Sequence, residues 1–521
     1  MNDAAGTHNR LRLRAVLAGV VGAMSGLAIA ELVGALLHVR LSPVLAVGQA
    51  VIEVTPGSLA EKAVSTVGQN DKPFLVTGVV VGLVLLSALG GLIALRNRVL
   101  GLAVFVLLAA VAVASELTRP GAQATDALPA LAGGVLGLIT VVWLLGVTST
   151  PTSVQSLPTG SREPGAGGLG RRLFLRQTAV VVVVAAGVAG VGRWIAEGRA
   201  AVEDARSKLR LGLRKPQRPK GVELGDPGLT PWVTPNSRFY RIDTALAVPL
   251  IKPQDWRLHI HGAVHKELTL TYPELISRGL VDAWITLCCV SNVVGGNLIS
   301  NARWTGVPIR KILDEVGVQP GANALLSTSS DGFTVGTPLS ALTDGRNALL
   351  AVAMNGVPLP IEHGFPVRQV VPGLYGYVSG TKWVTDWEVT SFDKFSAYWT
   401  QRGWSAMGPI KTQSRIDVPK SGQQLKTGRN VIGGVAWAQH TGIRRVQVQI
   451  DNDPWVDATL AADPSIDTWV QWAYDWDAPL GIHRITIRAT DRDGHTTGRE
   501  QTSPIPNGAD GWQTLVVEVN A

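Results

Sequence analysis

Cysteine is almost absent from this chain of 521 residues: the two that occur, Cys288 and Cys289, are adjacent. Two neighbours do not make a disulfide framework, because a bond between them strains the peptide that joins them. Histidine is also scarce in the apolar segments, where His38 is the only one. Since a haem held between two helices needs paired histidine ligands, we expect no haem in those segments.

Basic runs with interleaved aromatic residues are missing as well. The net charge is +8, but the N-terminal basic clusters flank apolar stretches instead. Nucleic-acid binders concentrate such charge in patches, so we expect no nucleic-acid partner. Cations beside apolar stretches are typical of membrane topology.

Five apolar stretches have the length of membrane spans, about 17–25 residues, and they define a predicted transmembrane region over residues 1–197. The stretches are residues 14–39, 73–95, 99–116, 128–147 and 178–195. Basic residues precede the first span, separate the second from the third and precede the fifth. By the positive-inside rule, the chain after about residue 197 lies outside. We therefore expect a multi-pass protein of a bacterial cytoplasmic membrane, in contact with membrane lipid and with its catalytic part on the extracytoplasmic side.

The fifth span opens with Arg171-Arg172-Leu173-Phe174-Leu175. Twin arginine before an apolar run resembles an export signal for folded proteins, here internal, over residues 171–195. The alternative is that both arginines are ordinary positive-inside residues. No small-residue cleavage site follows, so we expect the helix to remain as an anchor.

After the spans the pattern changes three times. Residues 198–221 are charged and end in a proline-broken basic stretch, which predicts a linker made of a solvated helix and then a tether. Residues 222–405 mix short strands with separate helices, which predicts an α+β domain. Residues 406–521 alternate in short strands between turn signals, which predicts an all-β, Ig-like sandwich. The predicted elements are a strand over 256–261, helices over 269–279 and 307–316, strands over 349–353 and 367–371, and C-terminal strands over 430–437, 444–450, 468–476, 483–489 and 513–519.

The cysteine pair lies near the end of an apolar, β-branched stretch, residues 284–292, which opens into a glycine-rich loop. A strand that ends in a thiol beside a flexible loop can present one sulfur to a bound metal. Because side chains alternate along a strand, Cys288 is then expected to face the other way and to pack as a small apolar residue.

Seven ordered blocks of sequence resemble the molybdopterin domain of the sulfite oxidase family. The blocks are Phe239-Tyr240-Arg241, residues 286–292, 302–306, 354–360, 363–368 and 371–373, and Lys382-Trp383. The resemblance implies an oxidoreductase with a molybdenum–molybdopterin cofactor, in which one pyranopterin dithiolene and one cysteine bind the metal. By its place in the Leu-x-Cys-x-x-Asn block, that cysteine is Cys289. Thiolate is a soft, charge-donating ligand that suits such an ion.

The cofactor carries a phosphate and ring heteroatoms, so its binding residues should include cations and hydrogen-bond donors. By family position the candidates are Tyr240, Arg241, His363, Arg368 and Lys382. Further candidates are Asp331, Thr337, Ser379, Gly380 and Thr381. The Arg303-Trp304 pair is expected to brace the cysteine loop.

Two departures from the family put sulfite in doubt as the substrate. Sulfite-oxidising members follow the cysteine block with two arginines, where this chain has Val293 and Val294. A tyrosine near the metal is matched here by Trp404, which we therefore count with Cys289 as a catalytic candidate. Losing cations removes attraction for a dianion. A less charged substrate, such as an S- or N-oxide, is expected in a pocket lined by valine and tryptophan.

The leading hypothesis is a membrane-anchored enzyme that carries out two-electron oxygen-atom transfer on a small substrate. Electrons would leave through a cytochrome or a quinone-linked carrier, and the C-terminal module resembles the family's dimerisation domain, which implies a homodimer. One alternative is a receptor or assembly module that retains the fold without catalysis. Another takes the cysteine pair as a thiol redox switch.

His259, His261 and His265 form a separate group. The first two share one strand face, which would suit zinc. Because no acidic or cysteine partner stands at ligand spacing in the sequence, we expect structural histidines instead.

Overall fold

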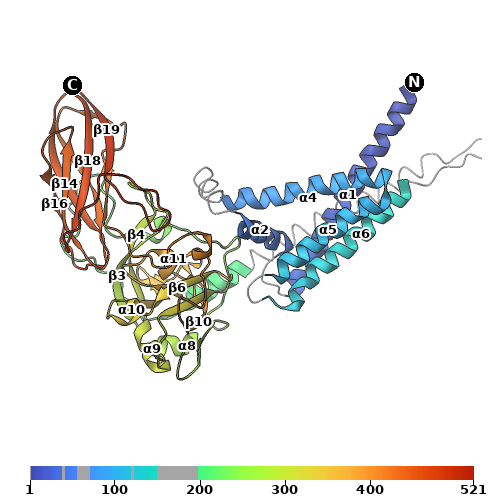
Figure 1. Ribbon diagram of the computed structural model, residues 1–521, viewed down its shortest axis with the longest axis horizontal. Helices are drawn as coiled ribbons and strands as arrows, with labels where there is room; N and C mark the ends of the chain where they lie inside the picture. The colour runs from blue at the N-terminus through green and yellow to red at the C-terminus, as the bar shows by residue number, and fades with distance from the viewer. Residues whose placement is uncertain (1, 38–41, 56–70, 119–121, 149–197) are drawn as a thin grey trace, which may run out of the picture. The chain divides into compact units, whose positions relative to one another are not determined.

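The computed structural model describes residues 2–37, 42–55, 71–118, 122–148 and 198–521. The chain forms two compact units, residues 1–201 with 245–247 and residues 202–244 with 248–521 (Figure 1). The first unit is helical, and the second combines strands with short helices. Each unit is described by itself.

The described residues of the first unit include four long helices: α1 (Asn2–Leu36), α4 (Asp71–Arg96), α5 (Arg98–Leu117) and α6 (Leu128–Thr148). Each contains a stretch long and apolar enough to cross a membrane. This confirms four of the predicted spans by length and composition. The fifth span and the twin-arginine segment lie outside the described residues.

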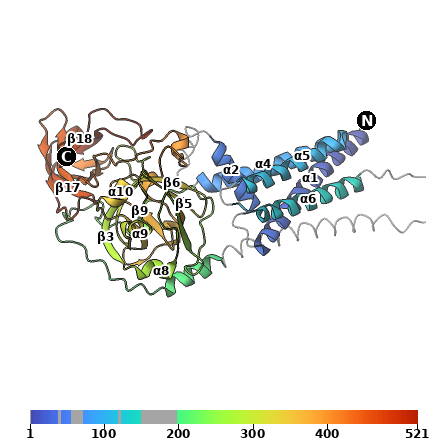
Figure 2. The ribbon, with the colours of Figure 1, turned by 60° about the horizontal axis from the view of Figure 1, so that its bottom comes forward.

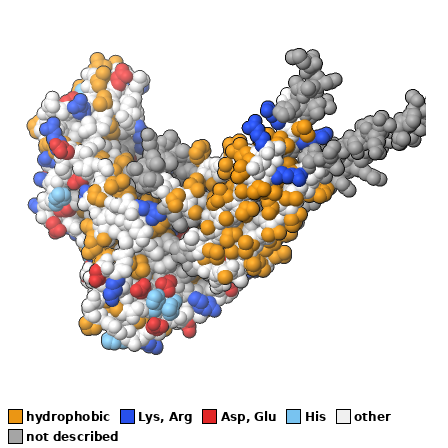
Figure 3. Space-filling model, turned by 45° about the vertical axis from the view of Figure 1, so that its right-hand side comes forward, with side chains coloured by type: hydrophobic (Ala, Val, Ile, Leu, Met, Phe, Trp, Pro, Cys, Tyr) orange, Lys and Arg blue, Asp and Glu red, His pale blue; other side chains and the backbone are white. Residues whose placement is uncertain are grey.

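The long helices run side by side (Figure 2), and small residues lie where they meet. A Cβ on Gly19 of α1 would strike the backbone oxygen of Ser87 on α4, and one on Gly26 would strike that of Gly133 on α6. Close backbone approach at small residues is how helices associate in lipid, where no hydrophobic force drives them together. The outward surface of this unit is covered by apolar side chains (Figure 3).

A shorter apolar helix, α2 (Pro43–Val54), follows α1. The sequence between the first two spans showed no clean period and left this helix unpredicted. Its start has an ordinary cause, because the Ser42 hydroxyl accepts a hydrogen bond from the Leu45 amide and proline occupies the first turn.

One five-stranded sheet of the second unit has the order β2-β1-β10-β5-β6. Its strands are β1 (Arg257–Gly262), β2 (Leu268–Thr271), β5 (Ala324–Ser329), β6 (Thr334–Pro338) and β10 (Val384–Thr390). The helix predicted over residues 269–279 is wrong at its start, because the chain is a strand through Thr271. Thr271 then forms a capping box with Glu274, and α8 covers only Tyr272–Ser277. The other predicted helix is confirmed as α9 (Ile309–Val316), with its apolar face buried.

A second sheet carries the cysteine pair. Its order is β3-β4-β7-β8, with β9 also paired to β7. The strands are β3 (Val281–Cys288), β4 (Ile299–Pro308), β7 (Leu349–Met354), β8 (Val357–Pro358) and β9 (Arg368–Val370). Short helices α10 (Ser340–Thr343) and α11 (Gly376–Ser379) complete this part. The central strand β7 is buried along its whole length, so it reads as a continuous apolar run.

The C-terminal region forms two further sheets around one apolar core. One contains β11 (Gln413–Val418), β13 (Gly428–Trp437), β16 (Thr459–Leu460) and β17 (Val470–Ala478). The other contains β12 (Gln424–Lys426), β14 (Ile443–Ile450), β15 (Val456–Asp457), β18 (Gly481–Asp491) and β19 (Gln513–Asn520). All five strands predicted here are confirmed. Four shorter or less regular strands, β11, β12, β15 and β16, were not predicted.

The linker begins with a helix, as predicted, over residues 198–208. The helix is attached to the second unit rather than solvated all round, because Val202 is buried in the core under β3 and β4. Arg206 donates from Nε to the Leu359 carbonyl at 2.8 Å. These contacts fix one end of the segment, so this part of it is not a free tether.

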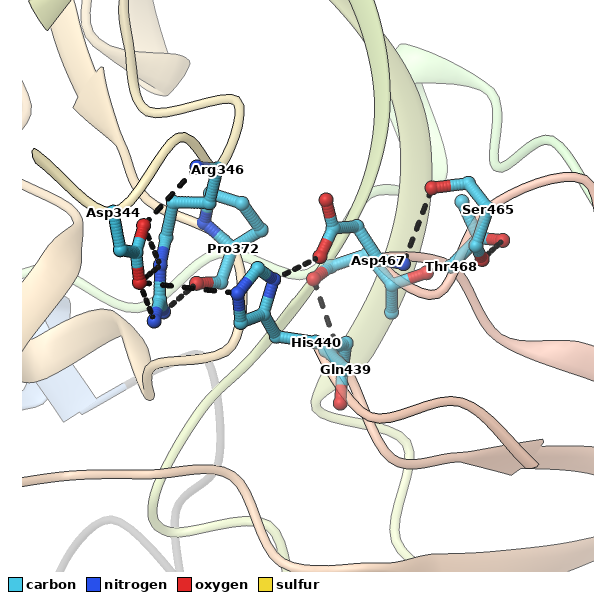
Figure 4. A network of polar contacts seen from close by, with 9 residues as sticks. Asp344, Arg346, Pro372, Gln439, His440, Ser465, Asp467 and Thr468 are labelled. Atoms are coloured by element: carbon cyan, nitrogen blue, oxygen red, sulfur yellow. Dashed lines mark hydrogen bonds and ion pairs between the residues drawn. The ribbon is translucent and has the colours of Figure 1, made fainter. Parts of the chain in front are cut away.

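The C-terminal region is hydrogen-bonded to β3, the strand that leads to the cysteines. The Thr286 hydroxyl of β3 accepts from the Trp469 amide at 2.9 Å, and the Thr286 amide donates to the Asp467 carbonyl at 2.9 Å. Beside it, the His440 imidazole lies between the Asp467 carboxylate, at 3.1 Å, and Asp344 (Figure 4). Buried hydrogen bonds of this kind hold the two parts of the unit in one register.

Candidate active site

A hollow of about 870 Å³, counted with its open mouth, lies in the second unit. It collects residues from loops that are far apart in sequence. Of the predicted site residues, its lining contains Tyr240, Arg241, Cys289, Asp331, His363, Arg368, Gly380, Lys382 and Trp404.

Cys289 lies at this hollow, immediately after β3 ends. Its neighbour Cys288 is 1% exposed and belongs to the apolar core, so the predicted alternation is confirmed. Without a metal, burial raises the pKa of the Cys289 thiol, while hydrogen bonds with Ser291 lower it. A bound metal ion would stabilise the thiolate in that place.

The loop after Cys289 is closed by the side chain of Asn292. Its Oδ1 accepts from the Leu298 amide at 2.8 Å, and the Cys289 amide donates to the Leu298 carbonyl at 2.9 Å. A Cβ on Gly296 would strike that same Oδ1, so glycine is required there. Trp304 of β4 braces the strand behind, because its indole donates to the Ile285 carbonyl at 3.1 Å. Arg303 also binds β3, through an ion pair with Asp282, so both residues of the predicted pair brace the strand before the cysteine loop.

Arg368 is a buried cation whose Nε has no hydrogen-bond partner among the described residues. Its guanidinium donates to the His363 carbonyl at 3.3 Å and lies 5.0 Å from the Trp304 ring. Burial lowers its pKa to about 10. A buried guanidinium without a facing carboxylate is costly, so the arrangement is suited to an incoming anion.

Lys382 and Arg241 lie beside a carboxylate that the sequence reasoning missed. Asp243 is 2.7 Å from Lys382 and 2.8 Å from Arg241, and its side chain is almost fully buried. Burial lowers the pKa of Lys382 to about 8, against the charge of Asp243, which raises it. Asp243 therefore offsets the charge of Lys382 and Arg241, the two cations that are expected to bind the cofactor.

His363 and Tyr240 complete the polar side of the hollow. Burial, followed by the charges of Arg368 and Lys382, lowers the pKa of His363 to about 4. The imidazole is then neutral, and its Nε2 donates to the Asn236 carbonyl at 3.2 Å, which leaves Nδ1 as an acceptor. Burial and the nearby Cys289 raise the pKa of Tyr240, so the phenol keeps its proton.

The other side of the hollow is aromatic. Trp399 and Trp404 approach edge to face with ring centroids 6.3 Å apart, and Tyr377 lies 6.0 Å from Trp404. The Tyr377 hydroxyl donates to the Ser405 carbonyl at 2.6 Å. The expectation that Val293 and Val294 line the pocket is wrong, because Val293 is exposed and neither residue lines the hollow, whereas Val290 does.

Three weaker candidates lie behind the lining rather than in it: Thr337, Ser379 and Thr381. The Thr337 hydroxyl donates a hydrogen bond to the Val378 carbonyl at 2.7 Å, and the Ser379 hydroxyl donates one to the Tyr375 carbonyl at 3.0 Å. Thr381 is buried, and its hydroxyl has no partner among the described residues. Asp331 does line the hollow, and burial raises the pKa of its carboxyl.

The sequence around this site is similar to that of known proteins. The family of oxidoreductase molybdopterin-binding domains matches residues 245–399. Mitochondrial sulfite oxidase of Homo sapiens is 29% identical over 341 residues, which cover 56% of this chain and 62% of that protein. The chain thus spans about three fifths of the length of this relative. An uncharacterized oxidoreductase of Bacillus subtilis, YuiH, is 29% identical over 153 residues, or 29% of this chain and 74% of that one.

Residues 245–399 therefore form an oxidoreductase molybdopterin-binding domain, and the second unit is similar to the sulfite oxidases. Among solved structures, the sulfane dehydrogenase SoxCD of Paracoccus pantotrophus is 22% identical and covers 56% of this chain and 85% of its own, with a TM-score of 0.49. The residues present fit the cofactor of the sulfite oxidase family. A buried guanidinium with an orphaned Nε, a buried lysine and a cysteine sulfur meet at one hollow.

Proposed function

We propose that this protein is a membrane-anchored molybdenum enzyme that transfers an oxygen atom, with two electrons, to or from a small substrate of low charge. The observation that carries the proposal is the meeting of the Cys289 sulfur and the buried Arg368 guanidinium at one hollow. When bound, molybdopterin would supply a metal that changes oxidation state by two electrons.

The chain's own residues divide the remaining work. Cys289 would hold the metal, and Arg368 and Lys382 would hold the phosphate of the cofactor. The neutral His363 and Tyr240 would hydrogen-bond its ring atoms. Because β3 is fixed by the Trp304 indole and the Thr286 hydroxyl, the sulfur is presented from a rigid strand end.

The aromatic wall supports a substrate of low charge. Trp399, Trp404 and Tyr377 give the hollow an apolar side, and the two arginine positions of sulfite-oxidising members hold valine, away from the lining. The Tyr377 hydroxyl is engaged with a backbone carbonyl, so it holds its wall in place. An S-oxide or N-oxide suits such a wall better than the sulfite dianion.

The finer features belong to the same proposal. Arg12 and Arg14, at the start of the apolar stretch of α1 (Leu11–Gly34), support a cytoplasmic N-terminus, as do Arg96 at the end of α4 and Arg98 at the start of α5. The second unit would then lie outside, after the fifth predicted span. Its electrons would pass to a cytochrome or quinone-linked carrier, and the C-terminal sheets would form an Ig-like module that pairs two chains.

The proposal is tested on full-length protein purified in detergent from a host that makes molybdopterin. We expect close to one molybdenum and one pterin per chain, by elemental analysis and by fluorescence of the oxidised pterin. A dye-linked assay should then favour neutral S- or N-oxides over sulfite. Protein without molybdenum from such a host would overturn the proposal, and sulfite as the preferred substrate would overturn its substrate half.

A further inference from the structure

A second group of ligand-type side chains lies on the exposed face of the sheet β2-β1-β10-β5-β6. His259 and His261 of β1 share that face, and the parallel register pairs His259 with Asp386 of β10. Their neighbours along the two strands point the other way: Leu258, Ile260 and Trp387 are buried. The sequence showed the two histidines but not the carboxylate, because β1 and β10 are far apart along the chain.

Asp386 approaches both imidazoles at once. Its Oδ2 lies 3.4 Å from Nδ1 of His259, and its Oδ1 lies 3.3 Å from Nε2 of His261. The two rings are stacked, with centroids 4.7 Å apart and planes 14° apart. One ligand atom from each of the three residues lies within 4.8 Å of the others.

These distances are compatible with two arrangements. The separation of 3.3 Å between His261 Nε2 and Asp386 Oδ1 is that of a long hydrogen bond, and charge-assisted pairs are usually shorter, about 2.7–2.9 Å. In a tetrahedral zinc site, with ligand bonds of about 2.0–2.1 Å, neighbouring ligand atoms lie about 3.3 Å apart. The two separations, one from each carboxylate oxygen, are close to that value.

The second nitrogen of His259 has a carboxylate nearby. Its Nε2 lies 3.8 Å from Oε2 of the exposed Glu267, beyond hydrogen-bond distance. A histidine ligand commonly directs its other ring nitrogen at a carboxylate, which fixes the ring and raises its basicity as a donor. Glu267 would take that outer position only after its side chain moves closer.

We propose that His259, His261 and Asp386 bind a divalent transition metal ion of the zinc type, apart from the hollow at Cys289. Two imidazole nitrogens and one carboxylate oxygen leave at least one position for water or another ligand. The side chains of His259, His261 and Asp386 are 46%, 29% and 35% exposed, so an ion can enter from solvent. Because all three ligands stand on adjacent paired strands, little backbone movement is needed to close the site.

The test uses the full chain in detergent, purified without a histidine tag and treated with a chelator, and titrates it with Zn²⁺ by calorimetry. We expect wild type to bind one Zn²⁺ more than His261→Gln or Asp386→Asn, or at least ten times more tightly. His265→Gln is the matched control, because this exposed histidine lies outside the trio, and it should bind like wild type.

A second measurement does not depend on the variants folding. Co²⁺ added to wild type should give the intense visible bands of a tetrahedral site with nitrogen and oxygen ligands, and Zn²⁺ should displace it. Equal Zn²⁺ binding by wild type and Asp386→Asn, or an octahedral Co²⁺ spectrum, would overturn the inference. Molybdenum content is measured on the same samples, so failure of this site is distinguishable from failure of the proposed cofactor.

Discussion

At the scale of single residues, the two cysteines differ only in the direction their side chains take. Cys289 lines the hollow and Cys288 is packed in the core. Adjacent positions on a strand end are enough to give one sulfur a chemical role and the other a packing role.

Replacing each cysteine separates these roles. Cys289→Ser should lower turnover by more than about 100-fold, since even outer-shell changes at metal sites cost about 10–100-fold. Cys288→Ala should keep the metal and lose about 1 kcal/mol or less of stability, as a small apolar contact is lost. Turnover and thermal unfolding of both variants check this, and a Cys289→Ser enzyme with normal turnover would contradict it.

Arg368 should show a conflict between stability and cofactor binding. In cofactor-free protein its buried charge faces no carboxylate among the described residues, so Arg368→Met should leave the free energy of unfolding unchanged or raise it by about 1–2 kcal/mol. The same variant should lose most of its pterin. Chemical denaturation and pterin analysis measure the two effects, and a variant that keeps full pterin content would refute the anchoring role.

His363 should make the cofactor-free protein sensitive to acid. Its pKa is lowered to about 4, against an unfolded value of about 6.5. Between these values the unfolded state binds more protons, so stability is full above about pH 6.5 and falls as the pH drops toward 4, by about 3 kcal/mol at most. His363→Gln should flatten this dependence in denaturation curves between pH 7 and 4; an unchanged slope would contradict it.

At the scale of elements, β3 is held from both sides. Trp304 of β4 binds it through the Ile285 carbonyl, and the C-terminal region binds it through Thr286. The Thr286 hydroxyl also donates to Asn301 Oδ1 at 3.0 Å. A strand fixed this way places the sulfur that follows it.

Thr286→Val should therefore affect the site from a distance. It leaves the Trp469 amide without its acceptor, at a cost of about 1–3 kcal/mol, and it frees the strand that ends at Cys288. We expect lower thermal stability together with reduced molybdenum occupancy. Thr269→Val, on the exposed side of β2, is the control and should change neither thermal stability nor molybdenum occupancy. Equal results for the two variants would contradict the role of Thr286 in holding β3.

Prediction from sequence succeeded where local pattern and local geometry agree. The cysteine alternation, α9 and the five C-terminal strands follow from periodicity alone. The start of α8 was misplaced because a capping box at Thr271 ends a strand there. Asp243, Tyr377 and Asp386 were missed, since each acquires its role from residues distant in sequence.

At the scale of the whole molecule, the apolar helices and the catalytic unit carry separate signals in the sequence. The helices follow from hydropathy, and their boundaries differ from the predicted spans mainly at α1, which begins at Asn2 rather than at residue 14. The predicted division at residues 405 and 406 is crossed by a shared core: the Trp232 and Trp469 indoles each donate to the other residue's carbonyl. We expect fragments cut at that point to fold poorly.

The orientation of the chain is testable as a whole. If the N-terminus is cytoplasmic and the second unit lies outside, trypsin added to spheroplasts should digest that unit, and inverted vesicles should protect it. An N-terminal tag should show the reverse pattern. Digestion of the unit only in inverted vesicles would contradict the proposed topology.

The most direct test of the central claim is X-ray absorption at the molybdenum edge, on wild type and Cys289→Ser protein. The account predicts one sulfur ligand fewer on the metal in any molybdenum that the variant retains, with the cofactor's own sulfurs unchanged. The same sulfur count in both proteins would show that Cys289 does not bind the metal.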